Sequence, residues 1–147
     1  MLKNNFSYEI LPDLNLVIRS FSGIIQLNDI LQSFDELEKD AEFSKNMNFL
    51  SDIRDVEIIF SANEIKTLIE KIQSNINIYG ERISVLLTES PNQALFGGLI
   101  DYYKRDKNIK LSIVSTVEYS LSLLGIAKEN DQIVIDTLKK LKKKSEK

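Results

Sequence analysis

The 147-residue sequence contains neither cysteine nor histidine, and both absences limit its chemistry. Without cysteine the chain can form no disulfide and offers no thiolate to a metal ion, which fits a cytoplasmic protein. Histidine is the usual proton shuttle near neutral pH and the commonest metal ligand. Its absence excludes Ser-His-Asp and Cys-His catalysis and classical zinc sites. We therefore expect a cytoplasmic protein that is not an enzyme and holds no cofactor or metal, with carboxylate, lysine or tyrosine chemistry as the remaining catalytic option.

Long hydrophobic runs are absent as well. No run approaches the ~20 apolar residues of a membrane helix, and the initial MLKNNFSYEI has one lysine and no long apolar segment, so we expect no secretory signal. A net charge of -3 gives no general attraction to nucleic acid or to anionic membranes. The hydrophobic share of 43% is that of a globular protein, and the length suits one domain with a substantial core.

Two strands are predicted at the start of the chain. Phe6–Leu11 and Leu14–Phe21 are apolar, β-branched and aromatic runs, and Pro12-Asp13 between them favours a turn. We expect an antiparallel hairpin whose second strand closes at Gly23, where the missing Cβ suits a bend.

Strand and helix patterns then alternate. Residues 47–53, 82–88 and 110–115 read as strands, with 52–57 as a polar loop after the first of them. Capping boxes at Ser61 with Glu64 and at Ser90 with Gln93 predict helix starts. The predicted helices begin at Asn28, Ser61, Ser90, Thr116 and about Asn130.

This order predicts an α/β fold in a single domain. The sequence β-β-α-β-α-β-α-β-α plus a C-terminal helix favours a mixed, mostly parallel sheet of about five strands, opened by the antiparallel hairpin, with helices packed on it. We assign residues 1–126 to this domain and residues 127–147 to an amphipathic helix with a lysine-rich tail. Ile133, Leu138 and Leu141 are expected to dock that helix on the domain or on a second subunit.

Four local patterns follow one another at a recognisable spacing. They are Gly23-Ile24-Ile25, the strand end Leu50-Ser51-Asp52-Ile53-Arg54-Asp55, Ser61, and Glu118-Tyr119-Ser120-Leu121 leading to Leu124-Gly125. Their order and spacing resemble the STAS-like (anti-sigma-factor antagonist-like) domains, in particular a small bacterial branch grouped with STAS and CRAL-TRIO domains. The resemblance covers roughly residues 6–126 and implies a non-enzymatic regulatory module that binds a protein partner or oligomerises.

Ser61 occupies the position that this resemblance assigns to a phosphorylated serine at the start of the second helix. A phosphate there would be stabilised by the free N–H groups and dipole of the helix. The family has Asp before the serine and Ser-Gly after it, whereas Phe60 precedes Ser61 and Ala62-Asn63 follow. The alternative, which we favour, is that Ser61 serves only as the helix N-cap.

Charged residues around the third strand form a candidate binding surface. Carboxylates next to an arginine could orient a magnesium ion or a hydroxylated ligand at the carboxyl end of a strand. The alternative, which we favour, is a salt-bridged and solvated loop without a metal. The residues concerned are Asp52, Arg54, Asp55, Glu57 and Glu64.

A glycine pair marks a candidate ligand pocket. Gly97-Gly98 lies inside a predicted helix, where each glycine costs about 1 kcal/mol relative to alanine. Either the helix approaches a strand or another helix closely, or a ligand lies against the glycines together with Tyr102 and Tyr103. Tyr79 and Tyr119 are further candidates for a lipophilic pocket, with packing as the alternative.

Three functions follow in order of preference. The first is the non-enzymatic interaction module, the second a carrier of a small apolar or amphipathic ligand, and the third a carboxylate-based enzyme using Asp52, Asp55 or Glu57.

The segment from Lys139 to Lys147 holds six lysines and one glutamate. Without interleaved aromatic residues we expect it to be a solvated end of the chain rather than a nucleic-acid contact.

Overall fold

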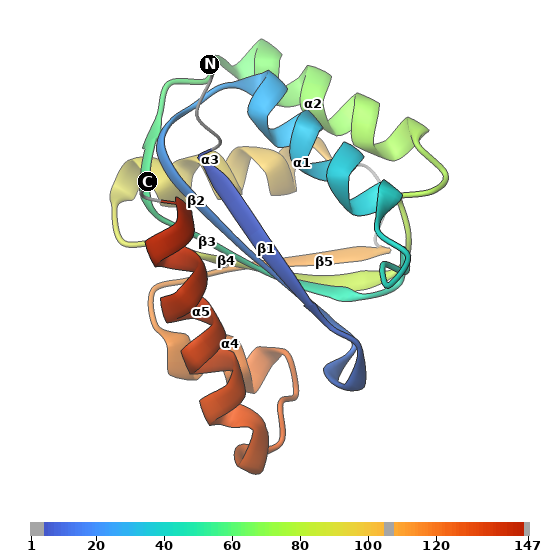
Figure 1. Cartoon of the computed structure of the whole chain (residues 1–147). Coiled ribbons are helices and arrows are strands. Elements are labelled where there is room, and N and C mark those ends of the chain that lie inside the picture. The colour runs from blue at the N-terminus through green and yellow to red at the C-terminus, as the bar shows by residue number, and fades with distance from the viewer. Residues whose placement is uncertain (1–4, 105–107, 146–147) are drawn as a thin grey trace.

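Five strands form one sheet in the order β1-β2-β3-β4-β5 in the computed structural model, which describes residues 5–104 and 108–145 (Figure 1). β1 runs antiparallel to β2, and every other neighbouring pair is parallel. The predicted α/β fold with an opening hairpin is therefore confirmed. The strands are β1 (Phe6–Leu11), β2 (Leu16–Ile25), β3 (Asn48–Ile58), β4 (Arg82–Leu87) and β5 (Ile109–Val114).

Helices cover both faces of this sheet (Figure 1). Because consecutive strands lie side by side, connections of one hand place α1, α2 and α3 on the same face. The last two helices follow β5 and cover the opposite face. No helix within residues 5–104 and 108–145 is long and apolar enough to cross a membrane. The helices are α1 (Leu27–Lys39), α2 (Ala62–Ser74), α3 (Pro91–Tyr103), α4 (Val117–Leu123) and α5 (Asp131–Ser145).

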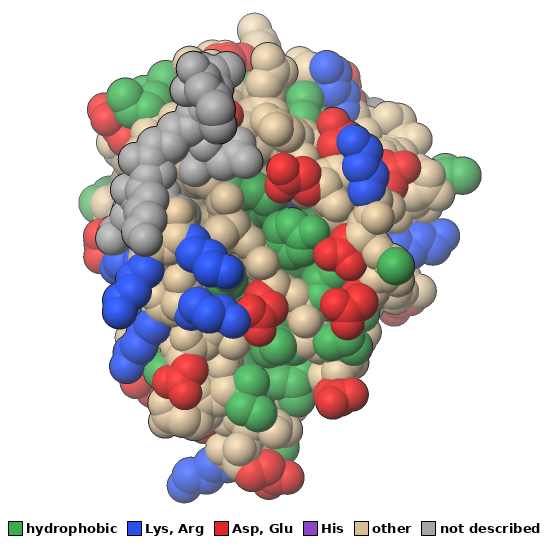
Figure 2. Space-filling view, in the orientation of Figure 1, with side chains coloured by type: hydrophobic (Ala, Val, Ile, Leu, Met, Phe, Trp, Pro, Cys, Tyr) green, Lys and Arg blue, Asp and Glu red, His purple; other side chains and the backbone are tan. Residues whose placement is uncertain are grey.

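The core has two layers because side chains alternate between the faces of each strand. On one face, Leu50 and Val85 pack with Val134, Leu138 and Leu141 of α5. The expected docking of this helix on the domain is thus confirmed through Leu138 and Leu141. The lysines of α5 gather on the outer surface (Figure 2), where Lys140 pairs with Glu9 of β1.

Two predicted strand ends were wrong. Gly23 does not close the second strand, because β2 continues to Ile25 with Gly23 at φ 76° inside it. Residues 52–57 are not a loop but the second half of β3. Both strands continue because β3 has one extra residue, a bulge, opposite Phe21. Beyond the bulge the parallel pairing resumes with Ser22 opposite Asp55 and runs to the ends of the two strands.

The capping boxes at Ser61 and Ser90 are confirmed. The first helix begins earlier than predicted, because Gln26 rather than Asn28 is its N-cap and forms the box with Asp29. Two side chains that were expected to pack against other residues are exposed, because they lie on the outer side of their helices. These are Tyr119, a candidate for a pocket or for packing, and Ile133, expected to dock the last helix.

Candidate functional site: a cavity under helices α1–α3

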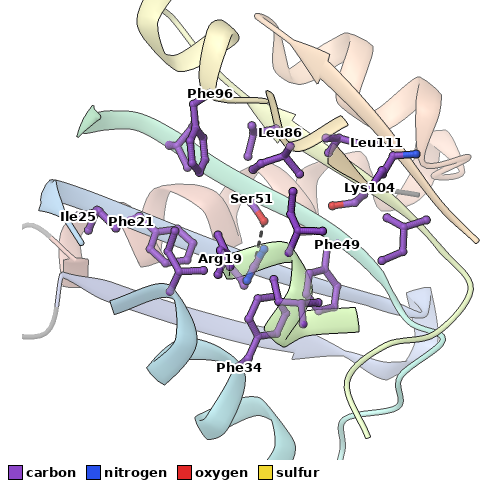
Figure 3. A pocket seen from close by; sticks show the side chains of 18 of the residues that line it. Arg19, Phe21, Ile25, Phe34, Phe49, Ser51, Leu86, Phe96, Lys104 and Leu111 are labelled. Carbon is purple, nitrogen blue, oxygen red and sulfur yellow. Dashed lines mark hydrogen bonds between the residues drawn. The ribbon is translucent and has the colours of Figure 1, made fainter. Parts of the chain in front are cut away.

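An apolar cavity of about 140 Å³ lies between the sheet and helices α1–α3 (Figure 3). Protein interiors are packed as densely as organic crystals and rarely leave a void larger than a water molecule. Two larger hollows, of about 430 and 540 Å³, are more open and have walls of mixed polarity, so we regard the smaller apolar cavity as the better ligand site. Its walls include Phe21, Phe34, Phe49, Leu86, Phe96 and Leu111.

Arg19 reaches this cavity from the middle of β2. Its side chain is buried, and its Nε donates a hydrogen bond to Oγ of Ser51 at 3.0 Å (Figure 3). The guanidinium carbon lies 4.6 Å from the ring centre of Phe49 and 4.9 Å from that of Phe34. Aromatic faces attract a cation at these distances. The Nη1 atom is buried, and no described residue forms a hydrogen bond with it.

Arg82, the first residue of β4, is the second buried cation in the wall. Its guanidinium carbon lies 4.3 Å from the ring centre of Phe49, and its Nη2 donates to the carbonyl oxygen of Ile78. Within residues 5–104 and 108–145 its Nε atom has no hydrogen-bond partner, and neither does the buried hydroxyl of Tyr79, another wall residue. The unpartnered atoms thus come from three residues that line one cavity.

The charges of the two arginines are not balanced by a carboxylate. No acidic side chain within residues 5–104 and 108–145 lies at ion-pair distance from Arg19 or Arg82. Burial, and then the charge of Arg82, lowers the pKa of Arg19 to about 9. Burial also lowers the pKa of Arg82 to about 10. Both groups still carry their charge at neutral pH. Lys104, which pairs with Asp101 at 3.3 Å, also lines the cavity and adds a third positive charge to its wall.

The cavity is polar in one part and apolar in another. Phe49, beside both guanidinium groups, is the register partner of Ser84, whose side chain also lines the cavity. Further along the strands the wall consists of apolar residues such as Ile25 and Phe96 (Figure 3). A ligand that is charged at one end and apolar at the other matches this distribution.

The candidate binding surface on β3 lies elsewhere. Asp52 is buried, and its carboxylate accepts hydrogen bonds from Nε and Nη2 of Arg54 at 3.0 and 2.9 Å. Asp55 pairs with Lys142 of α5 at 3.3 Å. Glu57 is exposed, as is Glu64, which caps α2. The ion pairs agree with the favoured alternative, although these residues form a strand and not a loop.

Among the residues that the structure describes, no three carboxylates lie close enough together to hold a metal ion.

Gln93 fixes the neighbouring end of β3, a role that the sequence did not indicate. Its Nε2 donates to the carbonyl oxygens of Arg54 and Val56 at 2.9 and 3.0 Å, while its Oε1 accepts from the N–H groups of Glu89 and Ser90. The capping pattern identified Gln93 only as part of the helix start.

The glycine pair does not border the cavity. A Cβ on Gly97 would lie 2.8 Å from Cγ1 of Ile113, so this glycine permits a close approach between α3 and β5. Gly98 faces open space, and Tyr102 is 77% exposed. Tyr103 packs against the apolar core without lining the cavity. The ligand pocket predicted at these four residues is thus replaced by one lined by other side chains.

Arg19 and Arg82 were not among the site residues predicted from the sequence. The available signal was a single arginine within each of two otherwise apolar strands, in the runs LVIRSF and RISVLL. A charged residue is almost never buried unless it is paired or has a functional use. Such an arginine in a strand predicted to be buried therefore marks a candidate site.

Ser61 is exposed at the start of α2, and its Oγ accepts a hydrogen bond from the N–H of Glu64 at 3.2 Å. This geometry accounts for the serine as an N-cap and leaves its phosphorylation a prediction.

No family model, curated protein or solved structure matches the chain. The resemblance to STAS-like domains accordingly stays a prediction as well.

Proposed function

We propose that this protein is a carrier that binds a small amphipathic ligand in the cavity between its sheet and helices α1–α3. The observation that supports this function is the cavity itself, an apolar space between the sheet and three helices. From the sequence alone a carrier was the second expectation, after an interaction module. In the structure Asp52 and Asp55 of the candidate binding surface pair with other residues, so the cavity carries the stronger argument.

The energetics of an empty cavity favour occupation. Closed cavities made by mutation cost about 24 cal/mol per Å³, so a space of about 140 Å³ that is partly open to solvent corresponds to at most roughly 3 kcal/mol. Apolar cavities of about 150 Å³ stay dry and bind molecules of the size of benzene. A ligand with an apolar body would recover part of this free energy by restoring van der Waals contacts.

The volume also limits the size of the ligand. A cavity of about 150 Å³ holds a six-carbon ring such as benzene. Because the present cavity is partly open to solvent, a straight chain of about eight carbons with a small head group can occupy it with one end at the opening. We therefore use eight-carbon compounds as probes.

A blocking substitution tests this function. Leu111→Trp places a larger side chain on a residue that lines the cavity, and Leu123→Trp makes the same change beside the other core layer. Isothermal titration calorimetry with 1-octanol should give binding to the wild type and to Leu123→Trp, and binding at least about tenfold weaker to Leu111→Trp. Urea unfolding establishes that both variants are folded. If neither 1-octanol nor the corresponding eight-carbon acid binds the wild type, or if both variants bind 1-octanol equally, the carrier function is refuted.

A further inference from the structure

Two buried arginines are costly in a pocket whose ligand is wholly apolar. Arg19 is 8% exposed and Arg82 6% exposed. Removing a charge from water is strongly unfavourable unless an opposite charge and good hydrogen bonds compensate it. Neither arginine has such a counter-charge within the part of the chain that the structure describes. The aromatic ring of Phe49 compensates only in part.

Unpaired hydrogen-bond donors on residues of the cavity wall also argue for a polar group on the ligand. Nη1 of Arg19, Nε of Arg82 and the hydroxyl of Tyr79 are buried and have no hydrogen-bond partner among the residues that the structure describes. Buried polar atoms almost always have a hydrogen-bond partner, so three unpaired ones around a single cavity call for an explanation. All three can donate a hydrogen bond, and all belong to residues that line the cavity.

We propose that the ligand is a monocarboxylic acid with an unbranched or planar apolar body, bound as its carboxylate beside Arg19 and Arg82. The inference rests on the carrier function proposed above and specifies the chemical class of its ligand. The apolar body extends along β2 toward Ile25 and Phe96, where the wall is apolar. The hydroxyl of Tyr79 supplies the third donor.

The number and placement of the donors favour a carboxylate over a phosphate. A carboxylate has two oxygen atoms that accept hydrogen bonds, and guanidinium groups bind it with good geometry. A phosphate monoester has three terminal oxygens and up to two charges. It requires more hydrogen-bond donors than a carboxylate, and the three unpaired atoms would not compensate the larger free-energy cost of removing it from water. The limited volume likewise suits the smaller head group.

The arginine side chains are already fixed in place without the ligand. Ser51 holds Nε of Arg19 at 3.0 Å, and Phe49 lies 4.6 and 4.3 Å from the two guanidinium carbons. A site that is preorganised in this way loses little conformational entropy when the anion binds. Ser51 and Phe49 are therefore positioning residues for the two arginines.

Three probes of equal chain length test the inference by calorimetry at pH 7.5. Octanoate should bind the wild type about tenfold or more tightly than 1-octanol, because charge-assisted hydrogen bonds form only with the acid. Octylammonium should not bind, because two like charges face it. In Arg19→Met and in Arg82→Met the preference for octanoate over 1-octanol should fall to within about twofold, while the affinity for 1-octanol is retained.

Lys110→Met is the matched control, because Lys110 is exposed on the same strand as Leu111. It removes one positive charge outside the cavity wall and should keep the preference for octanoate. Urea unfolding verifies the fold of each variant, and Arg82→Met carries the test if Arg19→Met is unstable. Equal binding of octanoate and 1-octanol, or an undiminished preference in both arginine variants, would overturn the carboxylate inference and leave the carrier function standing. Failure of both probes to bind would overturn both.

Discussion

Arg19 and Ser51 are register partners on the neighbouring parallel strands β2 and β3, and their side chains are joined by a hydrogen bond of 3.0 Å inside the cavity. This bond satisfies one of the buried nitrogen atoms of Arg19, while Nη1 stays unpaired. The pair thus shows both features of the site: the protein positions a buried cation and leaves part of its hydrogen-bonding capacity unused.

Replacing Ser51 with alanine should expose the cost of this arrangement. Ser51→Ala leaves a second nitrogen of buried Arg19 without a partner, so we expect the free energy of unfolding to fall by about 1 to 3 kcal/mol. Ser84→Ala makes the same chemical change at another cavity residue and should have a smaller effect. Urea unfolding of both variants measures the difference, and equal losses would contradict the role assigned to the Arg19–Ser51 bond.

The lowered pKa of Arg19 makes stability rise at alkaline pH. Burial and the charge of Arg82 lower this pKa to about 9 in the folded protein, while an unfolded chain keeps the much higher pKa of a solvated arginine. Between these values the unfolded state binds more protons than the folded state, so the free energy of unfolding increases with pH. Below about pH 9 both states hold the proton and the effect vanishes.

The comparison with Arg19→Met isolates this contribution. The free energy of unfolding of the ligand-free wild type, minus that of the variant, should increase by about 1 kcal/mol between pH 8 and pH 10. The range ends at pH 10 because the pKa of Tyr8 is raised to about 12 by burial and by its hydrogen bond to Asp40, which lowers stability above pH 10. If this difference in the free energy of unfolding stays constant or decreases with pH, burial does not lower the pKa of Arg19.

Gly97 and Gly98 should respond oppositely to alanine. In Gly97→Ala the new Cβ would lie 2.8 Å from Cγ1 of Ile113 and 2.9 Å from Cδ2 of Leu86, a cavity residue. We expect a net loss of about 1 kcal/mol despite the better helix propensity. Gly98→Ala meets nothing within 4 Å and should gain up to about 1 kcal/mol. Thermal unfolding of the two variants checks the opposite signs, and shifts of the same sign would rule out the close approach.

Ser61 allows its two predicted roles to be separated. As the N-cap of α2 it should cost about 1 kcal/mol of stability when replaced by alanine and almost nothing when replaced by aspartate, which caps equally well. A phosphorylation site would in addition show the mass of a phosphate on the intact protein from its native host. If Ser61→Asp proves as destabilising as Ser61→Ala, the capping role is wrong. Consistently unmodified protein would remove the phosphorylation hypothesis.

The elements with local signals could be predicted from the sequence. Pro12-Asp13 identified the hairpin turn, and the serine caps at Ser61 and Ser90 identified two helix starts. Residues 52–57 could not be assigned in this way. Their charges are accommodated within a strand because Asp52 pairs with Arg54, and Asp55 pairs with a lysine of α5 that lies far along the chain.

The cavity could not be predicted because it has no local pattern. It results from the way in which four strands and three helices fail to fill the space between them, and this depends on packing rather than on any one segment. The candidate site was therefore placed at Gly97 and Gly98, where a local irregularity was visible. Arg19 and Arg82 were visible only as charged residues in apolar strands, which indicates a site without revealing its shape.

The most direct test of the proposed function is a methyl NMR titration of the full chain with octanoate. Leu86, Leu111 and Ile53 line the cavity, whereas Val134 and Leu138 lie in the other core layer. Octanoate bound in the cavity should shift the methyl signals of the first group, with saturation, and leave those of the second group almost unchanged. Unchanged signals from Leu86, Leu111 and Ile53 at saturating octanoate would contradict the proposal that this cavity holds the ligand.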